Sequence, residues 1–188
     1  MKVSIEKKGT LFVHPVFIVG SYNENKVPNI CAVSWGGMCC SEPPSVGISL
    51  RPVRHSYKNI INSGAFTINI PSVDQIDAAD YSGVYSGRNE NKFETLGLTA
   101  VDAGVVNAPY VAEFPMALLC KLYKTIELGV HVQLIGEIID VIAEENVLNS
   151  NGLPDINQVK PFIYDSATRA YFATGDYLGE AYRNVKKV

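Results

Sequence analysis

Residues 29–57 read NICAVSWGGMCCSEPPSVGISLRPVRHSY, and this stretch decides the fold. It holds the end of a β-branched strand, a Gly36-Gly37 loop, a diproline turn and a short apolar strand over 46–50. A helix rich in cations and hydroxyls then begins near Arg54. A helix N-terminus offers unpaired N–H groups and a partial positive charge, which favour phosphate. The stretch therefore predicts a phosphate site, although Ser56 could be only an N-cap and the arginines only surface charges.

Strand-like segments dominate the rest of the chain. Their pattern predicts strands over residues 16–22, 27–35, 46–50, 65–70, 118–128 and 131–142, and helices over 54–63, 73–85 and 92–96. The last strand becomes apolar on both faces, so either a second copy of the chain or a packed helix must cover it. We therefore predict a mainly β fold, a β-barrel with a few short helices, formed as a single domain over residues 1–188.

Composition and charge exclude several classes of partner. With a net charge of −3 over 188 residues, the chain lacks the basic balance that a nucleic-acid surface needs. Its N-terminus shows no signal peptide, and its apolar runs are too short to span a membrane. The four cysteines form no CxxC pair, which favours a reduced, cytoplasmic setting. Cys39 and Cys40 are adjacent, a poor spacing for one metal ion, so we predict no metal site.

The ordered motifs resemble those of the flavin reductase-like, FMN-binding split-barrel family, and of its flavoredoxin group in particular. That family pairs an Asn-x-x-x-x-Ser-Trp strand with a Ser-x-Pro-Pro turn, an Ile-Ser-x-Arg-Pro strand end and a Ser-Tyr helix opening. The matching residues in this chain are Asn29, Ser34, Trp35, Ser41, Pro43, Pro44, Ile48, Ser49, Arg51, Pro52, Ser56 and Tyr57. Further matches follow in register at Ser86-Gly87-Arg88, Lys92-Phe93, Gly129-Val130-His131 and Leu178-Gly179-Glu180.

The resemblance implies a split β-barrel that binds FMN in a groove at the interface of a homodimer. It places Ala32, Val33, Ser34 and Trp35 along the flavin ring and ribityl chain, and Asn29 of the same strand is also a predicted cofactor-binding residue. Ser49, Leu50 and Arg51 would follow the ribityl and phosphate side. The phosphate candidates are Arg54, Ser56 and Tyr57. The remaining contacts with the cofactor would come from Ser86, Gly87, Arg88 and Lys92.

The chemistry implied by the resemblance is that of an oxidoreductase flavoprotein. Electrons would pass from NADH or NADPH, or from a protein donor, through FMN to an acceptor. The alternative is a non-enzymatic FMN carrier that shuttles electrons between redox partner proteins. His131 is the catalytic candidate beside the nicotinamide or the reactive flavin edge, unless a backbone carbonyl simply satisfies it at a strand end. No GxGxxG motif opens a helix after a strand, so nicotinamide would bind over the flavin.

Overall fold

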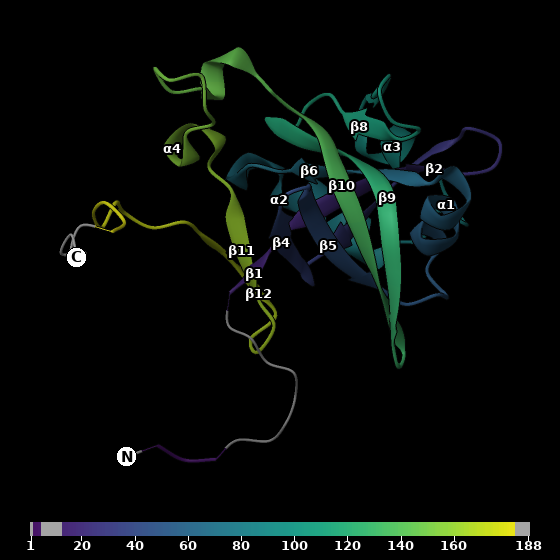
Figure 1. The fold of residues 1–188 in the computed structure, drawn as a ribbon, viewed down its shortest axis with the longest axis horizontal. Coiled ribbons are helices and arrows are strands. Elements are labelled where there is room, and N and C mark those ends of the chain that lie inside the picture. Colours follow the sequence, from purple (N-terminus) through teal and green to yellow (C-terminus); the bar gives the residue numbers. More distant parts are fainter. Residues whose placement is uncertain (1, 5–12, 183–188) are drawn as a thin grey trace.

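The computed structural model describes residues 2–4 and 13–182, and a seven-stranded antiparallel sheet forms its centre (Figure 1). The strand order is β3-β2-β6-β9-β10-β5-β4. The strands are β2 (Phe17–Tyr22), β3 (Pro28–Val33), β4 (Gly36–Ser41), β5 (Pro44–Leu50), β6 (Ala65–Ile70), β9 (Met116–Leu128) and β10 (His131–Ala143). The predicted mainly β fold with a few short helices is confirmed.

The sheet curls until the end of β3 approaches the end of β5, and there the barrel is split. The two strands are not neighbours in the ladder; instead the chain leaves β3, passes Ser34 and Trp35, and enters β4, which pairs with β5. One backbone hydrogen bond crosses the gap, from the Ser49 amide to the Trp35 carbonyl at 2.8 Å. Strand ends without a ladder partner leave backbone groups free, so the split can accept a ligand.

The prediction of a loop at Gly36-Gly37 is wrong, because these residues belong to strand β4. Gly36 and Gly37 begin this strand, and the strand predicted over 27–35 ends at Val33. The reason is steric, because a Cβ at Gly36 would lie 2.8 Å from the carbonyl oxygen of Gly47. Only glycine lets the two strands approach this closely, so a residue type typical of loops here serves strand pairing.

The barrel interior is filled by side chains from six of its strands. Ile48, Phe66, Cys120 and Leu134 are fully buried in one apolar cluster. The ring of Phe66 sits against Gly136, where a Cβ would lie 2.5 Å from the ring. Interiors of this density tolerate little added volume, so the interior is a packed core and the ligand space lies outside it.

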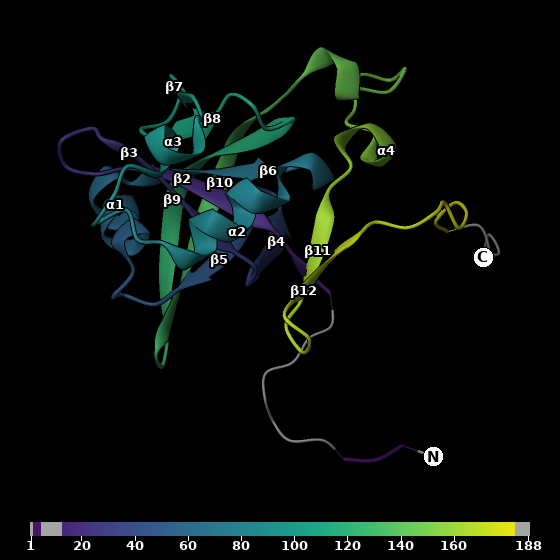
Figure 2. The same cartoon turned by 180° about the vertical axis from the view of Figure 1, so that it is seen from behind.

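Three short helices pack around the barrel, and the second and third lie on its far side from the β9–β10 pair (Figure 2). They are α1 (His55–Ser63), α2 (Ile76–Val84) and α3 (Lys92–Leu96), and a 3-10 turn, η1 (Val73–Gln75), precedes α2. Gly64 ends α1 and Gly97 ends α3, both in the left-handed conformation that favours glycine. The three predicted helices are confirmed, with the first turn of the second one tightened to 3-10 geometry.

Smaller elements complete the fold. A second sheet is formed by β1 (His14–Pro15), β11 (Phe162–Asp165) and β12 (Ala170–Ala173), and β7 (Ala100–Asp102) pairs with β8 (Pro109–Val111). The turns η2 (Glu145–Val147) and α4 (Ile156–Val159) precede β11. These elements are too short to show a period in the sequence. Within residues 2–4 and 13–182, no helix is long and apolar enough to cross a membrane.

Candidate functional site

A cleft of about 80 Å³, here named the anion pocket, lies at the N-terminus of α1. Side chains from β3, α1, α2 and α3 converge on it. They include three basic side chains, those of Arg54, His55 and Lys92, and no carboxylate. The lining residues are Asn29, Cys31, Ala32, Leu50, Arg54, His55, Ser56, Ser82, Gly83, Tyr85, Ser86, Gly87 and Lys92. This charge balance and the helix end together favour an anionic ligand.

The start of α1 leaves its own amides available to such a ligand. Its N-cap is Arg54, which has an extended backbone and makes no side-chain capping bond, and its first turn contains no acidic residue. Ser56 lies inside the first turn, so the interpretation of Ser56 as a mere N-cap is wrong. The positive end of a nine-residue helix therefore faces the pocket without a competing side-chain acceptor of its own.

Asn29 carries a buried polar atom that the protein leaves unpaired. Its side chain is only 6% exposed; Nδ2 donates to Ser56 Oγ at 2.9 Å, whereas Oδ1 has no partner among the described residues. An unpaired buried polar atom costs about 1–3 kcal/mol. Rotating the amide by 180° would let Ser56 donate to Oδ1 and aim two N–H donors at a ligand. The unpaired Oδ1 of Asn29 is therefore consistent with a pocket that binds a ligand.

Lys92 supplies a buried positive charge. Its side chain is 3% exposed, and Nζ donates to the carbonyl oxygens of Ser82 and Tyr85 at 3.0 Å each. Burial lowers the pKa of Lys92, and the two carbonyls use two of its three donors. Burial, followed by the charges of Arg88, Lys92 and Lys58, lowers the pKa of His55 as well. A bound anion would reverse both effects by supplying the missing opposite charge.

The second cleft, here named the ring groove, lies at the split of the barrel. Its volume is about 170 Å³, and its walls are the ends of β3 and β5. The lining residues are Ala32, Val33, Ser34, Trp35, Ser49, Leu50, Arg51, Arg54 and His131. Trp35 is 47% exposed, and its ring lies 4.8 Å from the ring of His131. Because Ala32, Leu50 and Arg54 also line the anion pocket, the two clefts are adjacent.

The two clefts bring together most of the residues predicted for the site. Two of the predicted residues lie elsewhere: Tyr57 packs against the barrel core, and Arg88 donates to the carbonyl of Val53 at 2.8 Å beside the pocket. Sequence reasoning missed Cys31 and Tyr85 as lining residues. Nothing in their local sequence marks them, because only the packing of β3 against α2 brings them to the pocket.

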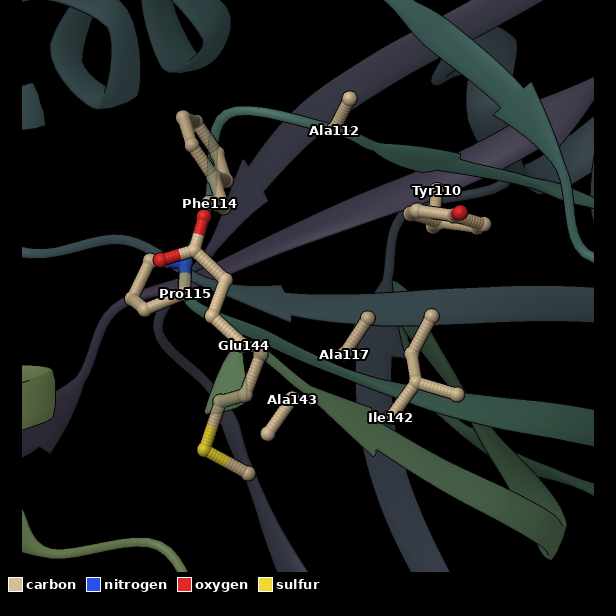
Figure 3. A pocket seen from close by; sticks show the side chains of 9 residues that line it. Tyr110, Ala112, Phe114, Pro115, Ala117, Ile142, Ala143 and Glu144 are labelled. Carbon is tan, nitrogen blue, oxygen red and sulfur yellow. The ribbon is translucent and has the colours of Figure 1, made fainter. Parts of the chain in front are cut away.

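A third cavity is separate from the predicted motifs. It has a volume of about 310 Å³, and Figure 3 shows mainly apolar side chains around it, with Glu144 at one end. It lies between the β8–β9 connection and the end of β10, and none of its lining residues was predicted to bind cofactor. In the described part of the chain, no group of three His, Cys, Asp or Glu side chains is placed to hold a metal ion.

Comparison with known proteins identifies the family. Residues 9–170 match the flavin reductase like domain. The chain belongs to this family. A flavoredoxin of Desulfovibrio vulgaris (Miyazaki F) shares 48% identity over 98% of this chain and 99% of its own, with a TM-score of 0.94. A flavoredoxin from Methanosarcina acetivorans shares 26% identity over 98% and 97%, with a TM-score of 0.92. An uncharacterized protein of Archaeoglobus fulgidus is 30% identical over 69% of this chain and 72% of its own.

The resemblance to this family and the predicted split-barrel fold are thus confirmed. Flavin reductase-like members of known structure include a putative flavin reductase with a split barrel domain from Shewanella frigidimarina, 26% identical with a TM-score of 0.80. The family likeness directs attention to the anion pocket and the ring groove, because the motifs shared with flavin reductase-like proteins line both clefts.

Proposed function

We propose that this flavin reductase-like protein binds FMN across the anion pocket and the ring groove and passes electrons through it to an acceptor. The observation that carries the proposal is that the two clefts are adjacent and share Ala32, Leu50 and Arg54 as lining residues. One end offers donors and positive charge, and the other offers an exposed aromatic wall. A molecule with a phosphate at one end and a flat ring at the other matches this arrangement.

In this proposal the anion pocket holds the phosphate. Arg54 offers a planar guanidinium, and Ser56 and the first amides of α1 offer further donors. Lys92 lies below them as a fixed positive charge, with Asn29 beside Ser56. Ser86 and Gly87 close the other side of the pocket. A phosphate dianion there would satisfy donors that otherwise have no partner in the protein.

The ring groove would hold the flavin. When bound, FMN supplies the capacity to accept a hydride or an electron pair and to release electrons. Backbone groups of residues 32–35 and 49–51 border the groove and can donate to or accept from a polar ring edge. Trp35 and His131 lie together at its outer end, where they would limit the access of water and position a second reactant.

We infer that NADH or NADPH is the electron donor, with His131 beside the site of transfer. The second candidate is a non-enzymatic carrier, supported by 48% identity to a protein described as a flavoredoxin. Steady oxidation of NADH or NADPH by the FMN-loaded protein would support the enzyme. Reduction only by a reduced protein donor would support the carrier.

We further propose that the chain acts as a cytoplasmic homodimer. Ile139 and Val141 on β10 are 43% and 46% exposed, and no described helix covers them. Tyr123, Leu128 and Val130 of the same strand pair are also exposed. Apolar side chains that recur along one strand pair are typical of a protein interface, and a second copy would cover them.

The decisive experiment compares FMN with riboflavin, which has the same ring and no phosphate. The protein is freed of flavin and titrated with each, and binding is followed by flavin fluorescence and by the visible spectrum. We expect FMN to bind at least about ten-fold more tightly, because the anion pocket recognises the phosphate. Failure to take up FMN would refute the proposal, and equal affinities would move the phosphate out of the anion pocket.

A further inference from the structure

A separate cavity of about 470 Å³ opens beside the ring groove, on the side of the β11–β12 hairpin. Here it is named the side pocket. Its lining comes from β3, α1, α2 and the hairpin: Val16, Ala32, Val33, Ser34, Arg54, Asp80, Gly83, Val84, Tyr164, Arg169 and Tyr171. Its volume suits a small organic molecule.

The side pocket shares a wall with the ring groove. Ala32, Val33, Ser34 and Arg54 line both. A molecule in the side pocket would therefore lie along the same segment of chain that borders the proposed flavin. The opposite wall comes from Tyr164 and Tyr171, which no predicted cofactor motif contains, so the cavity has a recognition surface of its own.

The far wall is held in place by a long-range contact. The Tyr171 hydroxyl donates to Asp80 Oδ1 at 2.9 Å and so ties β12 to α2. Burial and this hydrogen bond raise the pKa of Tyr171, so its hydroxyl stays protonated as the donor. Asp80 accepts this hydrogen bond, and Arg54 is assigned to the phosphate in the proposed function, which leaves Arg169 as the lining cation available to a second, charged ligand.

Arg169 lies in the turn of the hairpin, with a left-handed backbone (φ 57°). Among the described residues no salt bridge neutralises it. Arg54, the N-cap of α1, also lines the cavity. The guanidinium of Arg169, beside two tyrosine rings and three valines, forms a surface that suits an apolar or aromatic body carrying an anionic group.

We propose that the side pocket binds a small aromatic anion as the second reactant of the flavin site, with Arg169 as the residue that selects for the negative charge. This inference rests on the proposed function, because the second reactant must lie against the flavin. It assigns a specificity role to the β11–β12 hairpin, which lies outside the cofactor motifs.

The test compares 2-naphthoate with its neutral counterpart 2-naphthamide. Each is titrated into the FMN-loaded protein, with binding followed by the change in the flavin absorption band and by calorimetry. We expect 2-naphthoate to bind about ten-fold more tightly, and to change the flavin band because it lies beside the ring. Arg169→Gln should abolish this preference, and Arg169→Lys should keep most of it.

Lys160→Gln is the matched control, because Lys160 is also a cation at a left-handed position (φ 49°) and lines none of the three clefts around the site. It should leave both affinities unchanged. Equal binding of the two probes, or an unchanged preference in Arg169→Gln, overturns the inference.

FMN affinity is measured in the same variants. A large loss of FMN affinity in Arg169→Gln would mean that the side pocket holds part of FMN itself, which also overturns the inference. Calorimetry with the FMN-free protein separates the two proposals, since naphthoate binding there tests the pocket even if FMN does not bind. Selective binding by Arg169 without FMN uptake would refute only the proposed function.

Discussion

The indole ring of Trp35 lies against the imidazole ring of His131, with centroids 4.8 Å apart and planes inclined by 38°. The two residues are far apart in the sequence, and they meet because β10 pairs with β5, whose Ser49 amide donates to the Trp35 carbonyl across the split. Both rings line the ring groove. Since the chain has a single tryptophan, its fluorescence reports on the contact directly.

His131→Ala tests whether this ring serves catalysis or packing. We expect turnover with NADH or NADPH to fall by about ten-fold or more, because a positioned reactant is sensitive to small displacements. FMN affinity should change far less, and Trp35 emission should change in the FMN-free protein. Steady-state kinetics and FMN titration measure the two effects. Equal losses of turnover and FMN affinity would make His131 a structural residue.

Ser56→Ala tests the anion pocket. The variant removes a phosphate donor and also the partner of Asn29 Nδ2, so FMN binding should weaken by about 1–3 kcal/mol. Riboflavin binding should change little. Ser63→Ala is the control, because Ser63 ends the same helix and its hydroxyl bonds to the backbone of Ala65, outside the anion pocket. A similar loss for both ligands would argue that Ser56 supports the fold and not the phosphate.

Gly87→Ala tests the close approach of the 86–88 segment to β3. An added Cβ would lie 1.9 Å from Asn29 Oδ1, so the segment must shift and the pocket must widen. We expect weaker FMN binding and a loss of stability of about 1–3 kcal/mol, measured by urea denaturation. Gly37→Ala meets nothing within 4 Å and serves as the control. If Gly87→Ala keeps full stability and full FMN affinity, the close approach of residues 86–88 to β3 is not needed for either.

His55 makes the FMN-free protein sensitive to acid. Burial and the neighbouring cations hold its folded pKa below the ordinary value of 6.5, so the unfolded chain binds more protons. Its contribution is constant above about pH 6.5 and destabilises the fold as the pH falls towards the folded pKa. His55→Gln should therefore flatten the pH dependence of the unfolding free energy between pH 5 and 7. An unchanged slope would exclude His55 as its source.

The exposed side of β10 tests the homodimer. Replacing Ile139 and Val141 together by lysine puts charge into the proposed interface, so the dimer should dissociate. Light scattering after size-exclusion chromatography measures the molar mass. Val105→Lys is the control, since Val105 is 60% exposed and lies outside the strand pair. A dimer that survives the double substitution uses another surface.

Local patterns in the sequence were sufficient for the parts of the fold that depend on near neighbours. The span of α1 and its end at Gly64 follow from apolar spacing and from one glycine in the left-handed conformation. The β9–β10 pair follows from alternation over a long segment. The residues around Ser34 and Ser56 were also recognisable, because a family resemblance resides in short ordered motifs.

Tertiary structure alone decided which of these residues share a cleft. Gly36 is typical of a loop in the sequence, but in the structure the carbonyl oxygen of Gly47 lies close against it. Tyr57 is a predicted site residue, but in the structure it packs against the barrel core. Arg169 reaches the site region because a hydrogen bond joins Tyr171 to Asp80, 91 residues away. Contacts of this kind depend on the curl of the sheet and on packing between distant segments, which leave no period or spacing in the sequence.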